Sequence, residues 1–147
     1  MSSKVIVLDA NILIRAVLGA KVRDQLMRFK DVVTFLTPDI CFDDANKYLP
    51  ELFEKRCLSP QLALEVLAEL KKIIQIVDKE VYAVHAEEAK QRIKARDFYD
   101  WPIVATALAF RCPVWTEDRD FFGSGLSVWT SDRIHIFPLP TYLHLRE

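Results

Sequence analysis

Buried-strand patterns alternate with helical patterns along this chain. At residues 4–14, a β-branched apolar run leads to Asp9, and apolar residues at helical spacing follow at once. Apolar runs of this kind are typical of strands covered on both faces in a parallel sheet. The same pattern predicts two further central strands at 32–37 and 113–116. In such sheets the functional groups gather at the carboxyl ends of the strands, which is where Asp9 falls.

Apolar residues at helical spacing predict the connecting segments. We expect helices at 12–18, 22–29, 38–53, 60–74 and 103–110, one or two helices over 79–95, and further short strands at 74–77, 126–130 and 134–137. Ser59 and Pro60 mark a helix start, and Pro50 should kink or split the helix that contains it. Strands alternating with helices predict an α/β fold, a three-layer α/β/α sandwich with a central, mostly parallel sheet. We expect a single domain over residues 1–147.

Composition limits which partners the protein can bind and where in the cell we expect it. The formal net charge is −1, so a polyanion would have to be held by a local basic patch or through cations. Cys41, Cys57 and Cys112 are scattered, which favours small core residues in a reducing cytosol over disulfides or a zinc site. No apolar run approaches the length of a membrane span, and the first strand begins too early for a signal peptide. We therefore expect a cytoplasmic protein with no membrane contact.

Acidic residues stand at several predicted strand and helix ends. They are Asp9 after the first strand, Asp44 with Asp43 beside it after the second, Asp100 before a buried helix, and Asp118 and Asp120 after the third. Taken singly, Asp100 is typical of a helix cap, Asp118 and Asp120 of a turn, and Asp44 of a surface position. The joint pattern favours a site instead, because the carboxyl ends of parallel strands meet at one edge.

The chemistry of such a cluster points to hard metal ions. Neighbouring carboxylates repel one another unless cations neutralise them. Oxygen ligands without His or Cys favour Mg²⁺ or Mn²⁺ over zinc. These ions suit the attack of metal-activated water on a phosphodiester.

Three segments resemble the PIN-domain nucleases, especially the VapC-type toxin ribonucleases of toxin–antitoxin pairs. Residues 7–13 resemble the opening acidic motif of the family, 100–109 its third-acid helix, and 114–121 its closing Thr-x-Asp-x-Asp-Phe motif. The likeness runs from residue 4 to about residue 137 in the same order. It implies an endoribonuclease dependent on Mg²⁺ or Mn²⁺, with RNA as substrate. It also implies an antitoxin partner that occupies the acidic cleft, and a homodimer.

The resemblance also assigns roles to single positions. The implied metal-binding acids are Asp9, Asp100 and Asp118, and the implied supporting residues are Asn11, Thr116 and Asp120. The second acid of the family is usually Glu, whereas the matching position here is Asp44, with Asp43 as a possible substitute. Asp is one methylene shorter, so contact with a metal could pass through water.

Some side chains near the predicted acidic edge have two interpretations. Arg15, Lys47 and Arg119 are candidates for contacts with the RNA backbone, or are simply solvated. The tryptophans could stack on bases, although core packing is favoured for all three, Trp101, Trp115 and Trp129.

Other protein classes also gather acids at the strand ends of parallel sheets. A receiver-type signalling module would need a phosphoacceptor Asp after a central strand and a Lys ending a later one, and neither is found. A haloacid-dehalogenase-type phosphatase would need a second acid at Asn11. A PIN-fold protein that has lost catalysis and binds RNA or a protein partner stays open, because Asp44 departs from the family pattern.

Overall fold

In the computed structural model, residues 4–93, 98–118, 121 and 123–139 are described, and one parallel sheet lies at their centre. Its strands are β1 (Lys4–Leu8), β2 (Val33–Pro38), β3 (Ile74–Val77), β4 (Val114–Trp115) and β5 (Val128–Trp129). They lie in the order β3-β2-β1-β4-β5, and every neighbouring pair is parallel. The three strands expected in the centre are therefore adjacent, with β1 in the middle.

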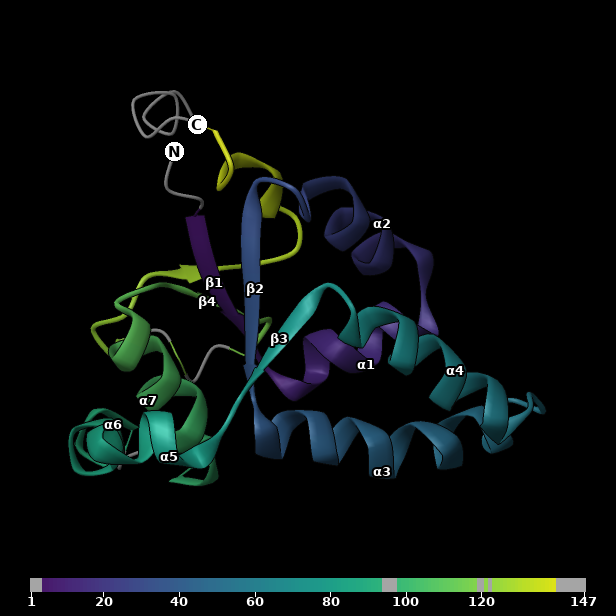
Figure 1. The fold of residues 1–147 in the computed structure, drawn as a ribbon, viewed down its shortest axis with the longest axis horizontal. Helices are drawn as coiled ribbons and strands as arrows, with labels where there is room; N and C mark the ends of the chain where they lie inside the picture. Colours follow the sequence, from purple (N-terminus) through teal and green to yellow (C-terminus); the bar gives the residue numbers. More distant parts are fainter. Residues whose placement is uncertain (1–3, 94–97, 119–120, 122, 140–147) are drawn as a thin grey trace.

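Helices cover both faces of this sheet. They are α1 (Ala10–Leu18), α2 (Ala20–Phe29), α3 (Asp39–Lys55), α4 (Pro60–Lys71), α5 (Lys79–Tyr82), α6 (Ala86–Ile93) and α7 (Trp101–Phe110), with 3₁₀ turns η1 (Ala83–His85), η2 (Phe98–Asp100) and η4 (Ile134–Ile136). Figure 1 shows α1 to α4 on one side of the strands and α5 to α7 on the other. The expected three-layer α/β/α sandwich is confirmed, and the sheet is wholly parallel.

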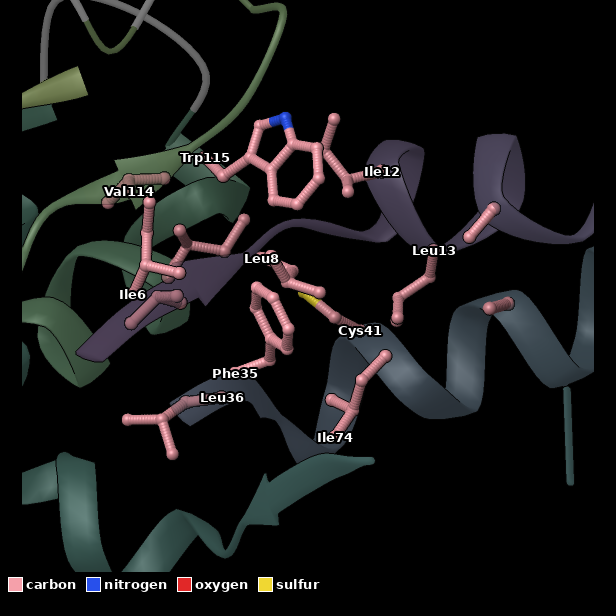
Figure 2. Close-up of a cluster of buried hydrophobic side chains, with 14 of the residues drawn as sticks. Ile6, Leu8, Ile12, Leu13, Phe35, Leu36, Cys41, Ile74, Val114 and Trp115 are labelled. Carbon is pink, nitrogen blue, oxygen red and sulfur yellow. The ribbon is translucent and has the colours of Figure 1, made fainter. Parts of the chain in front are cut away.

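The core forms where the central strands meet α1. Ile6, Leu8 and Trp115 have no exposed surface, and Phe35 is 2% exposed. Figure 2 shows Leu8 facing the Phe35 ring and Trp115 beside Ile12 of α1. Strands covered on both faces need apolar side chains on both, which explains why β1 reads as a continuous apolar run. This packing fixes the ends of β1 and β4, from which two of the predicted site residues project.

Two predicted features differ from the structure in part or in whole. Helix α3 runs without a break across Pro50, so the alternative that proline splits it is wrong. Its buried residues Ala45, Leu49 and Phe53 lie on one side of the helix, and their packing outweighs the backbone hydrogen bond that proline removes. The expected strand at 134–137 is instead η4, whose i→i+3 bonds include Ile136 N–H to the Arg133 carbonyl, 3.0 Å. In this turn Ile134 and Ile136 are buried and His135 is exposed, so the alternating pattern was misleading.

The cysteines are not all core residues. Cys41 is buried and Cys112 half-buried, but Cys57 is exposed, just after α3, at a φ of 59°. The expectation of a core position is therefore wrong for Cys57. All three thiols are free of disulfides. Among the described residues, no helix is long and apolar enough to cross a membrane.

Candidate functional site

A cavity of about 780 Å³ lies at the carboxyl ends of the central strands. Its acidic lining consists of Asp9, Asp39, Asp43, Asp44, Asp100 and Asp118. Each comes from the end of a strand or the start of a helix: Asp9 follows β1, and Asp39, Asp43 and Asp44 lie in the first turns of α3, which follows β2. Asp100 immediately precedes α7, and Asp118 follows β4. The sequence-predicted acids within the described residues thus share one cavity, and Asn11 lines it too.

Asp9 is held deep in this cavity. It is 4% exposed and is the N-cap of α1, where its Oδ1 accepts a hydrogen bond from the Ile12 backbone N–H, 2.9 Å. Its Oδ2 accepts a hydrogen bond from the Thr116 hydroxyl. Burial raises the pKa of Asp9 to about 6, against the lowering effect of these two hydrogen bonds, and nearby Asp118 raises it further. A nearby cation would oppose this shift.

Thr116 connects the ends of two strands. It is fully buried, and its hydroxyl donates to Asp9 while accepting a hydrogen bond from the backbone N–H of Asp118, 2.9 Å. The position expected to support the metals therefore orients Asp9 and the chain before Asp118. Asp120, the other supporting residue predicted in this motif, lies outside the described residues.

Asp100 does not act as a simple helix cap. It occupies the N-cap position of α7, with Pro102 in the first turn, yet its side chain makes no capping hydrogen bond. Its backbone is near φ −85° and ψ 4°, outside the extended conformation typical of a capping residue. The cap interpretation, which competed with a functional one, is therefore not supported, and the half-buried carboxylate lines the acidic cavity.

Sequence reasoning missed a hydrogen-bonded link between residues that line the cavity. The Tyr82 hydroxyl donates to Asp39 Oδ1, 2.6 Å, and the Lys79 backbone N–H donates to Asp39 Oδ2, 3.2 Å. Burial and the hydrogen bond to Asp39 raise the pKa of Tyr82. Its ring also packs edge-on against Trp101, with ring centroids 5.7 Å apart. The link ties α3 to α5 and α7, which carry opposite walls of the cavity.

A signal for Asp39 was present in the chain. Like Asp9, it directly follows a predicted strand and begins a helix. Tyr82 offered no comparable signal, because nothing in its local pattern indicates a partner 43 residues away.

Replacing Tyr82 with phenylalanine should lower the free energy of unfolding by about 1–2 kcal/mol. The ring and its packing remain, but the half-buried Asp39 Oδ1 loses the Tyr82 hydroxyl as a donor and keeps the Ile40 backbone N–H, 2.8 Å. Urea unfolding followed by circular dichroism measures the change. Tyr48→Phe is the matched control, because Tyr48 is 46% exposed and phenylalanine keeps its ring contact with Lys47, and its effect should stay within about 0.5 kcal/mol. Equal effects of the two substitutions would contradict a structural role for the link.

The predicted basic residues are placed differently from the acids. Arg15 lines a second cavity, and Lys47 lies over the Tyr48 ring at 5.5 Å without lining the acidic cavity. Arg119 lies outside the described residues. Within the part of the chain that the structure describes, the basic residue that lines the acidic cavity is Lys79, which sequence reasoning did not single out.

The tryptophans differ in burial. Trp115 is fully buried, as core packing predicts, and its indole N–H donates to Ser131 Oγ, 3.1 Å. Trp129 is half-buried and packs against Phe137, with ring centroids 5.6 Å apart. Trp101 is half-buried, packs on Tyr82 and also lines the acidic cavity.

Carboxylates and the Asn11 amide line the cavity together with the Cys41 thiol. Burial raises the pKa of that thiol, so the oxygen donors are the groups that suit a hard divalent cation. The buried Asp9 carboxylate, with its raised pKa, is the group that a cation would stabilise most. Among the described side chains, however, no three of the Asp, Glu, His and Cys type are close enough together to hold an ion. The chemistry of the donors therefore fits a metal, while their spacing requires the side chains to draw closer or to bind through water.

The protein is a parallel α/β sandwich with an acidic cavity at the carboxyl ends of its strands, the edge at which proteins of this class bind their ligands. A sequence model of the PIN domain matches residues 7–137. The chain therefore belongs to the PIN domain family. A comparison with curated protein sequences finds no significant match.

Solved structures share this fold. A chain of VapBC2 from Rickettsia felis, bound to a promoter DNA fragment, is 13% identical with a TM-score of 0.67, covering 86% of this chain and 98% of that one. A chain of a toxin–antitoxin complex from Klebsiella pneumoniae is 19% identical, with a TM-score of 0.60 and coverage of 86% and 97%. PAE2754 from Pyrobaculum aerophilum is 14% identical, with a TM-score of 0.63 and coverage of 92% and 89%. The likeness extends over nearly the whole described fold.

Proposed function

We propose that this protein is an endoribonuclease dependent on Mg²⁺ or Mn²⁺. The observation that carries the proposal is the meeting of Asp9, Asp44, Asp100 and Asp118 in one cavity of a PIN domain. A divalent ion bound by Asp9, Asp100 and Asp118 would activate water for attack on an RNA phosphodiester and stabilise the charge that develops.

The residues of this chain have distinct tasks in the proposed reaction. Thr116 keeps one Asp9 oxygen oriented by its hydroxyl, while the Ile12 N–H fixes the other. Lys79 is the basic residue in the cavity and would attract the phosphate. The deep position of Asp9 limits access of bulk water, which strengthens electrostatic interactions at the site.

The biological role proposed here is that of a toxin paired with an antitoxin protein. Its support is the similarity of fold to chains in VapBC structures and in a toxin–antitoxin complex. An antitoxin that inserts a basic side chain into the acidic cavity would block it by charge complementarity. The proposal includes a homodimer and a cytoplasmic location, both carried over from the family resemblance.

A second candidate is a PIN-fold module that binds RNA or a protein without cleaving. The observation that favours it is the spacing of the described carboxylates, no three of which are close enough to hold an ion. Asp44, which is one methylene shorter than the usual Glu, also favours the module that does not cleave. Binding of metal separates the two candidates.

We expect Mn²⁺ to bind to the wild-type protein in calorimetric titration and to raise its resistance to urea. Asp118→Asn and Asp100→Asn should each weaken the affinity at least about tenfold, because each removes a charged oxygen ligand. Asp24→Asn is the control, since Asp24 is an exposed acid on α2, away from the cavity, and it should leave the affinity unchanged. Absence of Mn²⁺ binding by the wild type would favour the non-catalytic module.

A further inference from the structure

A second cavity lies beside the acidic one. It measures about 700 Å³, and its basic residues are Arg15 from α1, Lys21 from α2 and Arg56 from the end of α3. All three side chains are exposed, and none forms an ion pair with an acid of the described residues. Arg56 lies 41 positions after Arg15 in the sequence, so the fold brings these charges together.

Both acids that line this second cavity accept hydrogen bonds from Thr130 or Ser131, which line it as well. A Glu117 carboxylate oxygen accepts a hydrogen bond from the Ser131 backbone N–H, 2.5 Å. Asp132 accepts one from the Thr130 hydroxyl. The described residues that line the cavity include three cations and two acids, which gives this lining a net positive charge. Helix α2 begins beside it without a capping side chain. Unfilled backbone N–H groups at a helix start add to the attraction for anions.

The two cavities lie along one helix. Asn11 lines the acidic cavity and Arg15 the basic one. They are four residues apart on α1, about 6 Å along its axis, and so project from the same side of the helix. Ile14 and Leu18 repeat the arrangement, the first lining the acidic cavity and the second the basic one. A chain leaving the acidic cavity along this face of α1 therefore reaches the basic cavity.

We propose that the basic cavity binds a backbone phosphate of the same single-stranded RNA whose scissile phosphodiester enters the acidic cavity. This inference rests on the proposed function for its substrate class, although the phosphate site itself does not require cleavage. Arg15 and Arg56 hold the phosphate, and Lys21 adds to the attraction. The arrangement lets a protein with a net charge of −1 bind a polyanion next to a cluster of carboxylates.

The test is the salt dependence of RNA binding. A fluorescently labelled, single-stranded 12-nucleotide RNA is titrated with wild type, with Arg15→Gln plus Arg56→Gln, and with Lys55→Gln, in Ca²⁺ buffer from low to moderate salt. Loss of two phosphate contacts should weaken binding about tenfold or more at low salt and reduce the slope of log K against log salt by about 1.4. Lys55 adjoins Arg56, is exposed and does not line the cavity, so its replacement should change the affinity less than about twofold.

The outcomes separate this inference from the proposed function. Unchanged affinity and slope in the double variant would overturn the phosphate site. Equal weakening by Lys55→Gln would overturn it as well, because the effect would then be one of general charge. RNA binding with the expected slope but without cleavage in Mg²⁺ or Mn²⁺ would keep the site and contradict the nuclease.

Discussion

Replacing Asp9 with asparagine should reduce RNA cleavage more than about 100-fold while leaving the protein at least as stable at pH 7. In the proposed function Asp9 is a direct metal ligand. Loss of such a ligand should have a larger effect than loss of a group that orients one, which costs about 10- to 100-fold. The free energy of unfolding should not fall with the activity, because the wild type pays the cost of holding an ionised carboxylate that is only 4% exposed. Asparagine can still accept the Ile12 N–H hydrogen bond without the charge.

The free energy of unfolding should also depend on pH through Asp9. The pKa of Asp9 rises from 3.8 to about 6 on folding, with burial as its main cause. The folded protein therefore keeps this proton to higher pH than the unfolded chain does. The favourable contribution of Asp9 is fully present below pH 3.8 and is lost as the pH rises through about 6, by about 3 kcal/mol. Asp9→Asn should lack this decline.

Urea unfolding in EDTA at pH 4, 5, 6 and 7 measures the difference between the two proteins. Asp24→Asn serves again as the exposed control and should follow the wild-type profile. A profile for Asp9→Asn that declines as steeply as that of the wild type would contradict the assigned burial and pKa. Together, lost activity and retained stability would mark Asp9 as a functional residue, since residues kept for packing lose both when replaced.

Replacing Trp115 with alanine should lower the free energy of unfolding by about 3–5 kcal/mol. Trp115 is fully buried in β4, is paired in register with Leu8 of β1 and Trp129 of β5, and lies 6.2 Å from the Phe35 ring, centroid to centroid. Figure 2 shows it among the side chains that join the central strands to α1. Its removal leaves a cavity that a rigid sheet cannot close.

A milder substitution at the same position separates packing from hydrogen bonding. Trp115→Phe keeps most of the ring but loses the indole N–H donated to Ser131, and it should lower stability by about 1–2 kcal/mol. Met27→Ala, at a position 50% exposed, should change stability by less than about 0.5 kcal/mol. Chemical unfolding of the three variants under one condition gives the comparison. A Trp115→Ala variant as stable as Met27→Ala would contradict the described core.

The local sequence pattern was sufficient to predict the strands and helix starts that carry the acidic residues. The apolar runs before Asp9 and Asp118 each belong to strands buried on both faces, and such strands leave a clear continuous pattern. Helix starts at Asp100 and after Pro38 were marked by proline. Because parallel strands end at one edge, these local predictions also placed the acids in one cavity.

Features that depend on tertiary contacts could not be predicted from local patterns. The alternation at 134–137 fits either a strand or η4, and hydrogen-bond partners decided the outcome. The link from Tyr82 to Asp39 and the approach of Arg56 to Arg15 join residues about 40 positions apart. Nothing in either local segment specifies its partner.

RNA cleavage by the purified protein in Mg²⁺ or Mn²⁺, with an EDTA control and Asp9→Asn alongside, tests the central claim most directly. We expect single-stranded RNA to be cut in the presence of either ion, and cleavage to be lost both in EDTA and in the variant. Cleavage that persists in EDTA or in Asp9→Asn would contradict metal-dependent hydrolysis at this cavity. Failure of the wild type to cut RNA, together with failure to bind Mn²⁺, would contradict the enzyme and favour a binding module on the same fold.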